Sequence, residues 1–103
     1  MNFCIECKSF EEFESALKQM EEHTVLHWAS QTSLPWAYVG DTRHSGIMDG
    51  AKSYLEYNGA VFIEIGLQQQ RIWYGDSASY ESDFTIPYTT GFLNNKHFER
   101  LRK

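Results

Sequence analysis

The hydrophobic pattern changes its period within the first twenty residues of the chain. Over positions 2–7, Phe3 and Ile5 alternate with Cys4 and Glu6, and this period of two predicts a short, half-buried strand. From position 10 onwards, apolar residues recur at steps of three and four, which predicts an amphipathic helix. The apolar stripe of that helix consists of Phe10, Phe13, Leu17 and Met20.

The ends of this helix are marked by a capping motif and by β-branched residues. Ser9 followed three residues later by Glu12 is a capping box, so we expect the helix to start there. Thr24 and Val25 favour an extended chain, so we expect the helix to end near His23.

Strand and turn signals dominate the remainder of the chain. Asn58-Gly59 is the favoured pair for a two-residue hairpin turn, and it separates two candidate strands. Residues 40–52 are rich in glycine and show little periodicity, so they are predicted to form a loop. Pro87 restricts the last candidate strand to a sheet edge. Candidate strands lie at 25–29, 36–40, 53–57, 60–65, 71–75 and 84–88, and a short helix is predicted at 94–101.

Together these elements predict an α+β fold. The expected architecture is a mainly antiparallel sheet of about five or six strands, with one long N-terminal helix packed on a face and a short C-terminal helix. At 103 residues the chain is expected to form a single domain, residues 1–103.

Composition and charge narrow the choice of partner. The chain is 42% hydrophobic and 22% charged, which is typical of a globular protein. Its net charge is −5, and an acidic chain does not suit direct nucleic-acid binding, which needs a basic face against phosphate. A basic protein, such as one that itself binds nucleic acid, is the better-matched partner.

Two polar segments carry the candidate partner-binding residues. Segment 73–84 interleaves aromatic and acidic side chains, so it can offer ring area and phosphate-like charge to a basic protein. Segment 40–52 is long for a loop, and long loops often carry function. The candidate partner-binding residues are Asp41, Arg43, His44, Asp76, Tyr80, Glu81 and Asp83.

Four residues near the start have the types and spacing of a two-Cys, two-His zinc site, namely Cys4, Cys7, His23 and His27. If residues 25–29 form a strand, the two histidines lie in different elements. The two cysteines then point to opposite faces of another strand and cannot close a tetrahedral site. We therefore predict no metal and no cofactor, and a structural zinc module is kept as an alternative.

Catalytic signals are weak. The Cys-x-x-Cys pair precedes the Ser9 cap instead of lying at a helix N-terminus, which argues against a redox role. No nucleophile elbow, P-loop or dinucleotide motif is present, so we expect no enzyme activity. A second alternative is a protein that binds a small ligand such as a nucleotide signal, with Arg43, His44 and Arg71 against phosphate.

The N-terminal sequence shows neither the basic region nor the apolar run of a signal peptide, and no apolar stretch is long enough to span a bilayer. We therefore expect a cytoplasmic protein with reduced thiols and no membrane partner. Its predicted edge strands and numerous aromatic residues permit a homodimer.

Residues 9–30, SFEEFESALKQMEEHTVLHWAS, resemble small proteins encoded by bacteriophages and prophages. In those proteins a capped helix of the form F-x-x-F-x-x-A-L leads into a strand with a Trp and then Ser or Gly. Several small acidic members inhibit host defence, including anti-CRISPR proteins. The resemblance implies a non-enzymatic accessory protein that binds and inhibits a host protein in the bacterial cytoplasm. The likeness is carried by Phe10, Phe13, Ala16, Leu17, Trp28 and Ser30, whereas Gln31 replaces the usual Gly.

Overall fold

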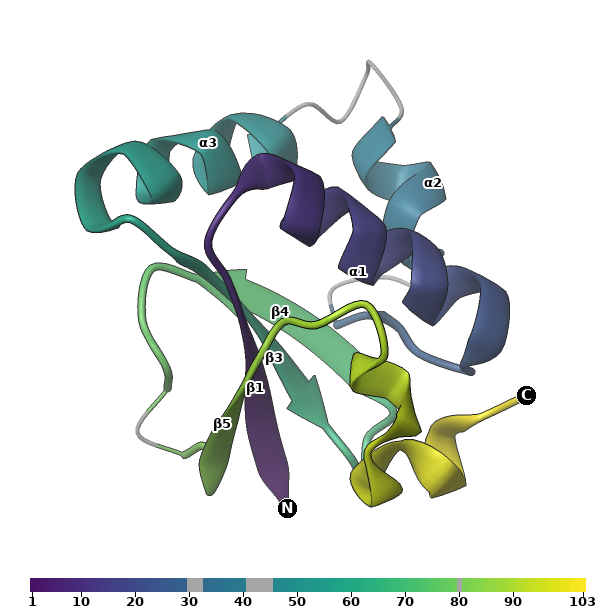
Figure 1. Ribbon diagram of the computed structural model, residues 1–103. Helices are drawn as coiled ribbons and strands as arrows, with labels where there is room; N and C mark the ends of the chain where they lie inside the picture. The colour runs from purple at the N-terminus through teal and green to yellow at the C-terminus, as the bar shows by residue number, and fades with distance from the viewer. Residues whose placement is uncertain (30–32, 41–45, 80) are drawn as a thin grey trace.

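The computed structural model describes residues 1–29, 33–40, 46–79 and 81–103, which form an α+β fold (Figure 1). In chain order the elements are β1 (Asn2–Cys7), α1 (Phe10–His23), β2 (His27–Trp28), α2 (Pro35–Gly40), α3 (Gly46–Asn58), β3 (Val61–Gly66), β4 (Arg71–Gly75), β5 (Phe84–Pro87) and the 3₁₀ helices η2 (Phe92–Asn94) and η3 (Lys96–Leu101).

The five strands form one mixed sheet in the order β2-β4-β3-β1-β5. β1 pairs with β3 and β3 with β4 in antiparallel fashion, whereas β1 pairs with β5 and β2 with β4 in parallel. The prediction of a mainly antiparallel sheet is therefore wrong. The parallel pairs arise because two connections are crossovers. α1 and the segment before β5 each carry the chain to an edge of the sheet, where the next strand runs in the same direction as the strand before the connection.

The helices α1, α2 and α3 lie along one face of the sheet (Figure 1). The core between them is built from the inward-facing residues of the strands and the apolar stripe of α1, as the pattern of the sequence predicts. From the strands it includes Phe3, Ile5, Cys7, Val61, Ile63 and Ile65, and from α1 it includes Phe13, Leu17 and Met20.

The predicted boundaries of α1 are confirmed. The Ser9 hydroxyl accepts a hydrogen bond from the Glu12 amide at 3.1 Å, and the Glu12 carboxylate accepts one from the Lys8 amide at 2.8 Å. The helix ends at His23, and Thr24 adopts an extended conformation. α1 is nevertheless one of three α-helices in the described residues, so the prediction of one long N-terminal helix is wrong.

Two predicted β segments are helical. Residues 36–40, predicted as a strand, belong to α2, and Pro35 suits the first position of that helix because its fixed φ is helical. The predicted loop 40–52 and strand 53–57 coincide largely with α3, and residues 41–45 lie outside the described ranges. The stripe that makes α3 amphipathic consists of Ile47, Ala51, Tyr54 and Leu55.

Asn58-Gly59 ends a helix and does not turn a hairpin. Gly59 has φ 75°, and its amide donates a hydrogen bond to the carbonyl of Leu55 at 3.0 Å. This left-handed glycine is the usual residue at the C-terminus of a helix. The hairpin prediction is therefore wrong, although the predicted strand 60–65 that follows the glycine is present as β3.

The remaining elements follow the predictions more closely. β4 matches the predicted strand 71–75, and β5 is an edge strand with Pro87 at its end. The predicted strand 25–29 shortens to β2, and the C-terminal helix predicted at 94–101 forms as 3₁₀ turns.

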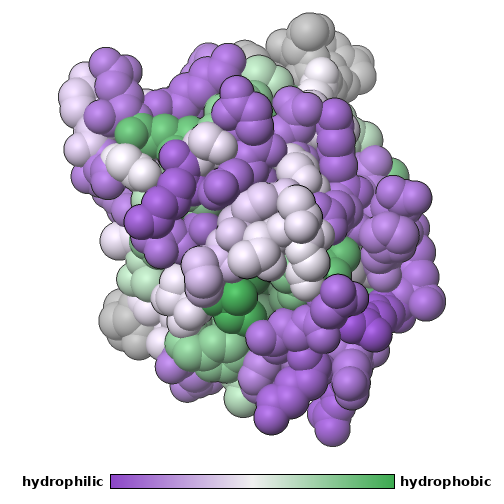
Figure 2. Space-filling model, viewed as in Figure 1, coloured by the Kyte–Doolittle hydropathy of each residue, from purple (hydrophilic) through white to green (hydrophobic). Residues whose placement is uncertain are grey.

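On the side seen in Figure 2 most of the surface is hydrophilic, and a hydrophobic patch lies over β5.

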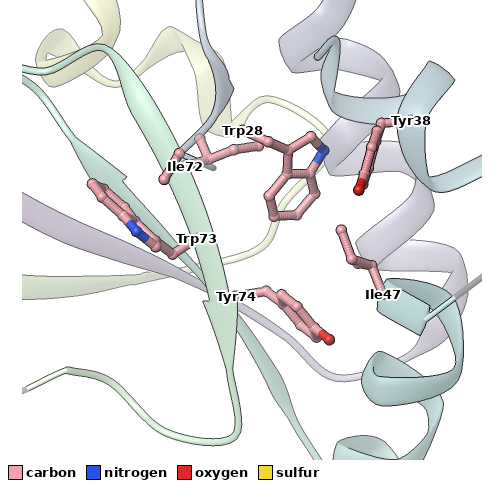
Figure 3. A pocket seen from close by; sticks show the side chains of 7 residues that line it. Trp28, Tyr38, Ile47, Ile72, Trp73 and Tyr74 are labelled. Atoms are coloured by element: carbon pink, nitrogen blue, oxygen red, sulfur yellow. The ribbon is translucent and has the colours of Figure 1, made fainter. Parts of the chain in front are cut away.

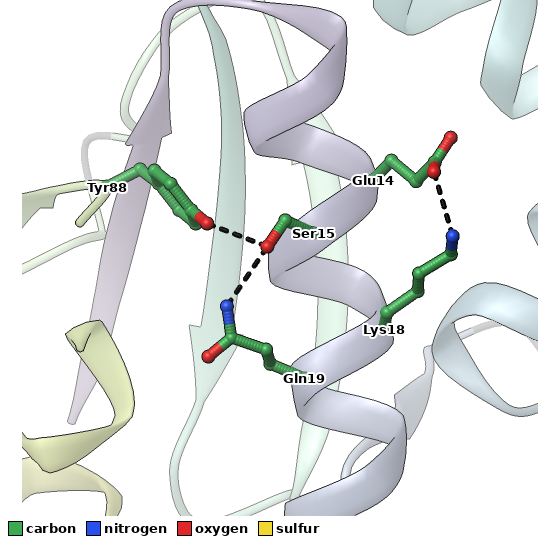
Figure 4. A network of polar contacts seen from close by, with 5 residues as sticks. All are labelled: Glu14, Ser15, Lys18, Gln19 and Tyr88. Carbon is green, nitrogen blue, oxygen red and sulfur yellow. Dashed lines mark hydrogen bonds and ion pairs between the residues drawn. The ribbon is translucent and has the colours of Figure 1, made fainter. Parts of the chain in front are cut away.

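A small polar network joins the chain after β5 to α1 (Figure 4). The Tyr88 hydroxyl and the Ser15 hydroxyl lie 2.7 Å apart, and the Gln19 amide donates to the same Ser15 oxygen at 3.0 Å. On the outer side of α1, Lys18 and Glu14 form an ion pair at 2.8 Å. None of the helices in the described residues is long and apolar enough to cross a membrane.

Candidate functional site

The face of the sheet opposite α1, α2 and α3 carries no helix in the part of the chain that the structure describes (Figure 1). We call it the open face. Pairing registers define its central rows, because residues directly opposite one another share a face. Glu64 lies opposite Trp73 on β4 and Cys4 on β1, and Phe62 lies opposite Glu6 on β1.

Trp73 is an aromatic residue of the open face and is 39% exposed, whereas Phe62 on the same face is half-buried. Figure 3 shows its ring on the other side of β4 from the rings of Trp28 and Tyr74. The ring lies against Gly66, where an added Cβ would be 3.0 Å from Trp73 Cζ3. Gly66 therefore leaves the space in which the indole rests on the sheet.

The connection between β4 and β5 covers the other half of this face. Ser82 Oγ lies 2.9 Å from Cys4 Sγ, and the Asp83 amide donates to the Asn2 carbonyl at 2.7 Å. Cys4 is consequently fully buried although it belongs to the open face. The uncovered area is thus confined to β3 and β4, around Trp73.

Acidic groups surround this uncovered area. Glu6 and Glu64 come from the strands, and Glu64 also accepts a hydrogen bond from the Asn2 side chain at 3.4 Å. Arg71 is the basic residue of β4, and its guanidinium donates to the Gln70 carbonyl at 3.2 Å. The open face is therefore predominantly acidic. Its acidic residues, with those of the adjoining connection, are Glu6, Glu64, Asp76, Glu81 and Asp83.

Three of the predicted partner-binding residues lie in the described connection next to the open face. Asp76, Glu81 and Asp83 are exposed, and the Asp83 carboxylate accepts a hydrogen bond from the Asn2 amide at 3.3 Å. The other four, Asp41, Arg43, His44 and Tyr80, lie outside the described residues. Sequence reasoning missed Phe62 and Glu64, although the alternation of buried and half-buried positions in β3 is a signal for them.

The four residues with zinc-finger spacing are dispersed. Cys7 belongs to the core beneath α1, whereas Cys4 points to the open face, where it meets Ser82. His23 is the last residue of α1, and His27 lies in β2. Within the described ranges, no group of three or more His, Cys, Asp and Glu side chains is arranged to hold a metal ion.

Both thiols are held in the neutral form. Burial, with smaller contributions from Glu12 and Glu6, raises the pKa of Cys7 to about 12. Burial also raises the pKa of Cys4, and the hydrogen bond with Ser82 opposes that effect in part. Because the thiolate is the reactive form, this pair has the properties of structural cysteines.

A cavity of about 480 Å³ lies on the helix side of β4. Its lining in the described chain comes from Trp28, Ala29, Tyr38, Ile47, Ile72, Trp73 and Tyr74 (Figure 3). Arg71, a candidate phosphate ligand, does not belong to this lining.

Comparison of the chain with protein-family models, with curated proteins and with solved structures gave no match.

Proposed function

We propose that the protein is a non-enzymatic binding protein whose open face docks on a basic protein. The observation that carries this proposal is the position of Trp73, partly exposed on an uncovered sheet face and directly opposite Glu64. Tryptophan is among the residues that contribute most to binding energy at protein interfaces.

Rigidity supports this role for Trp73. The indole rests on the backbone of Gly66, and β4 is held by β3 along its length. An aromatic side chain that is already held in place loses little conformational entropy when a partner covers it. Trp73 therefore has the properties of an interface anchor.

Charge complementarity indicates the class of partner. Glu64 lies directly opposite Trp73, while Glu6 on β1 and Asp83 beside Asn2 add negative charge further along the same face, with Arg71 as the basic residue of β4. Such a surface attracts Lys- and Arg-rich proteins, and it disfavours nucleic acid through repulsion from phosphate. The surface that the partner presents would be basic, like the surfaces with which proteins bind nucleic acid.

The resemblance of residues 9–30 to phage-encoded proteins gives this binding role a biological context. In that context, the partner is a bacterial host protein that handles nucleic acid, and occupation of its basic surface inhibits it. The open face competes for that surface because it combines carboxylates with an exposed ring.

The proposal is tested by affinity capture from bacterial lysates with matched surface variants. Trp73→Ala removes the anchor, and Glu64→Lys reverses a charge beside it. Glu56→Lys is the control, because Glu56 is exposed on α3, on the helix side of the sheet. We expect a stoichiometric partner that the wild type and Glu56→Lys retain and that both open-face variants lose.

Salt provides an independent readout of the same complex. An acidic surface bound to a basic partner should dissociate progressively as ionic strength rises, because screening weakens complementary charge. A partner that binds both open-face variants as well as the wild type contradicts the proposal. The absence of any captured partner from several bacterial hosts contradicts it as well.

A further inference from the structure

The aromatic cavity on the helix side of β4 shares Trp73 with the open face but differs from it in chemistry. Trp28 and Tyr74 form one corner of it, with ring centroids 6.0 Å apart and ring planes at 87°. Tyr38 of α2 and Ile47 of α3 line the opposite side (Figure 3). A volume of about 480 Å³ is within the range of small-molecule sites.

The polar groups of this cavity are few and uncharged. No lining residue among those described carries a charged side chain. The Trp28 indole N–H already donates to the Pro35 carbonyl at 2.9 Å. Burial, with a smaller contribution from Tyr54, raises the pKa of Tyr74, so that hydroxyl stays protonated at neutral pH.

Among the described lining residues, Tyr74 carries a hydroxyl, which lies beside Gly50 of α3. This hydroxyl makes no hydrogen bond to another described residue, and it can donate or accept one. The perpendicular rings of Trp28 and Tyr74 allow a flat ligand to stack on one ring while its edge meets the face of the other. A charged ligand would lose its hydration here without gaining a counter-charge from the described lining.

We propose that this cavity binds an uncharged, planar ring compound of one or two fused rings, stacked against Trp28 and hydrogen-bonded to Tyr74. The inference does not rest on the protein-binding role of the open face, although Trp73, whose ring lies on the other side of β4, also belongs to the cavity lining.

The test titrates the purified protein with indole and, in parallel, with indole-3-acetate, which carries the same ring system and a negative charge. Two-dimensional amide NMR follows the indole N–H of Trp28 and the backbone amides of Ile47 and Tyr74. We expect saturable shifts of these resonances with indole and binding of indole-3-acetate that is weaker by about tenfold or more. The indole N–H of Trp36, which is not among the described lining residues, serves as an internal reference.

Cavity-filling variants provide the second arm. Ile47→Trp places a large ring in the cavity and should weaken indole binding by about tenfold or more, and Ile47→Phe should do so partially. Tyr57→Trp is the matched control, because it adds a tryptophan to the same helix at a position that is 80% exposed. If Ile47→Trp fails to fold, the affinity of Ile47→Phe for indole still tests whether the ligand lies in this cavity.

Several outcomes overturn the inference. Shifts that persist unchanged in the Ile47 variants place the ligand elsewhere. Equal or tighter binding of indole-3-acetate contradicts the uncharged class. Absence of saturable shifts with indole contradicts the site itself.

Discussion

The hydroxyl of Tyr74 lies where a side chain on Gly50 would begin. A Cβ added to Gly50 would be 2.5 Å from the Tyr74 oxygen and 3.2 Å from two carbons of its ring. The ring cannot withdraw freely, since Trp28 meets it edge-on and Tyr54 packs at 5.7 Å. Gly50 thus allows α3 to approach β4 closely.

Replacing this glycine by alanine should destabilise the protein although alanine is the better helix former. Gly50→Ala gains about 1 kcal/mol of helix propensity. Overpacking against a confined ring costs about 1–3 kcal/mol. We therefore expect a net loss of about 1 kcal/mol in the free energy of unfolding, measured by urea denaturation.

A double-mutant cycle isolates the contact. Tyr74→Phe removes the oxygen at 2.5 Å and leaves the ring carbons at 3.2 Å, so Gly50→Ala should cost less in that background. Gly46→Ala is the control within the same helix, because nothing lies within 4 Å of an added Cβ there. An equal cost of Gly50→Ala in both backgrounds would show that the hydroxyl is not the obstacle.

A carboxylate of α1 caps α2 across the fold. Glu21 Oε1 accepts hydrogen bonds from the amides of Trp36 at 2.9 Å and Ala37 at 2.8 Å. Glu21→Ala leaves both amides without this acceptor and should cost about 1–2 kcal/mol in the free energy of unfolding. Glu21→Gln keeps an acceptor oxygen and should cost less.

The neighbouring residue provides the control for this cap. Glu22 is exposed, and its Oε2 lies 3.8 Å from Nε2 of His23. Glu22→Ala should therefore change the free energy of unfolding by less than about 0.5 kcal/mol. If the Glu21 and Glu22 variants lower the free energy of unfolding equally in chemical denaturation, the Glu21 carboxylate does not stabilise α2 as a cap.

The sequence predicts β1 and α1 correctly because their signals are local. The alternation of Phe3 and Ile5 defines the strand, and the hydroxyl of Ser9 begins the helix through its own neighbours. The helix ends before Val25, whose amide instead donates to the Leu101 carbonyl at 2.7 Å. Signals of this kind need no knowledge of the tertiary fold.

The order of the strands depends on contacts that no local pattern encodes. Phe84 of β5 stacks on Phe3 of β1 with ring centroids 5.0 Å apart, and the two strands run parallel. Asn2 and Asp83, which are hydrogen-bonded beside this contact, are 81 positions apart in the sequence. The candidate site has the same origin. Asp76, Glu81 and Asp83 are recognisable as exposed acids, but the pairing of Glu64 with Trp73 follows only from the register of β3 and β4.

Alkaline stability should report the burial of Cys7. The ordinary thiol pKa is 9.0, and burial raises that of Cys7 to about 12. Above pH 9 the unfolded chain loses this proton while the folded chain keeps it, so the folded state binds more protons. Stability is therefore fully retained below pH 9 and falls as the pH rises towards 12, by about 1.4 kcal/mol per pH unit for this group.

Cys7→Ala separates this effect from other titrating groups. The variant loses packing at every pH, but its free energy of unfolding should fall less steeply than that of the wild type between pH 9 and about 12. Cys4 and Tyr74 also have raised pKa values, so part of the slope should remain. Parallel pH profiles of the two proteins from guanidinium denaturation would contradict the assignment to Cys7.

The hairpin prediction at Asn58-Gly59 fails because a left-handed glycine serves both a hairpin turn and a helix C-terminus. The spacing of Ile47, Ala51 and Leu55 distinguishes the two, since it continues a helical stripe up to the glycine. The backbone of Gly59, with φ 75°, is the feature common to both interpretations.

Gly59 and Gly50 are glycines for different reasons, and two substitutions separate them. Nothing lies within 4 Å of an added Cβ at Gly59, so the cost of Gly59→Ala is conformational and should be about 1 kcal/mol. Asparagine tolerates the left-handed region, so Gly59→Asn should recover much of that loss in urea denaturation. At Gly50 the obstacle is steric, and Gly50→Asn should be at least as destabilising as Gly50→Ala. If asparagine is no better than alanine at position 59, the helix end is not determined by the left-handed conformation of that residue.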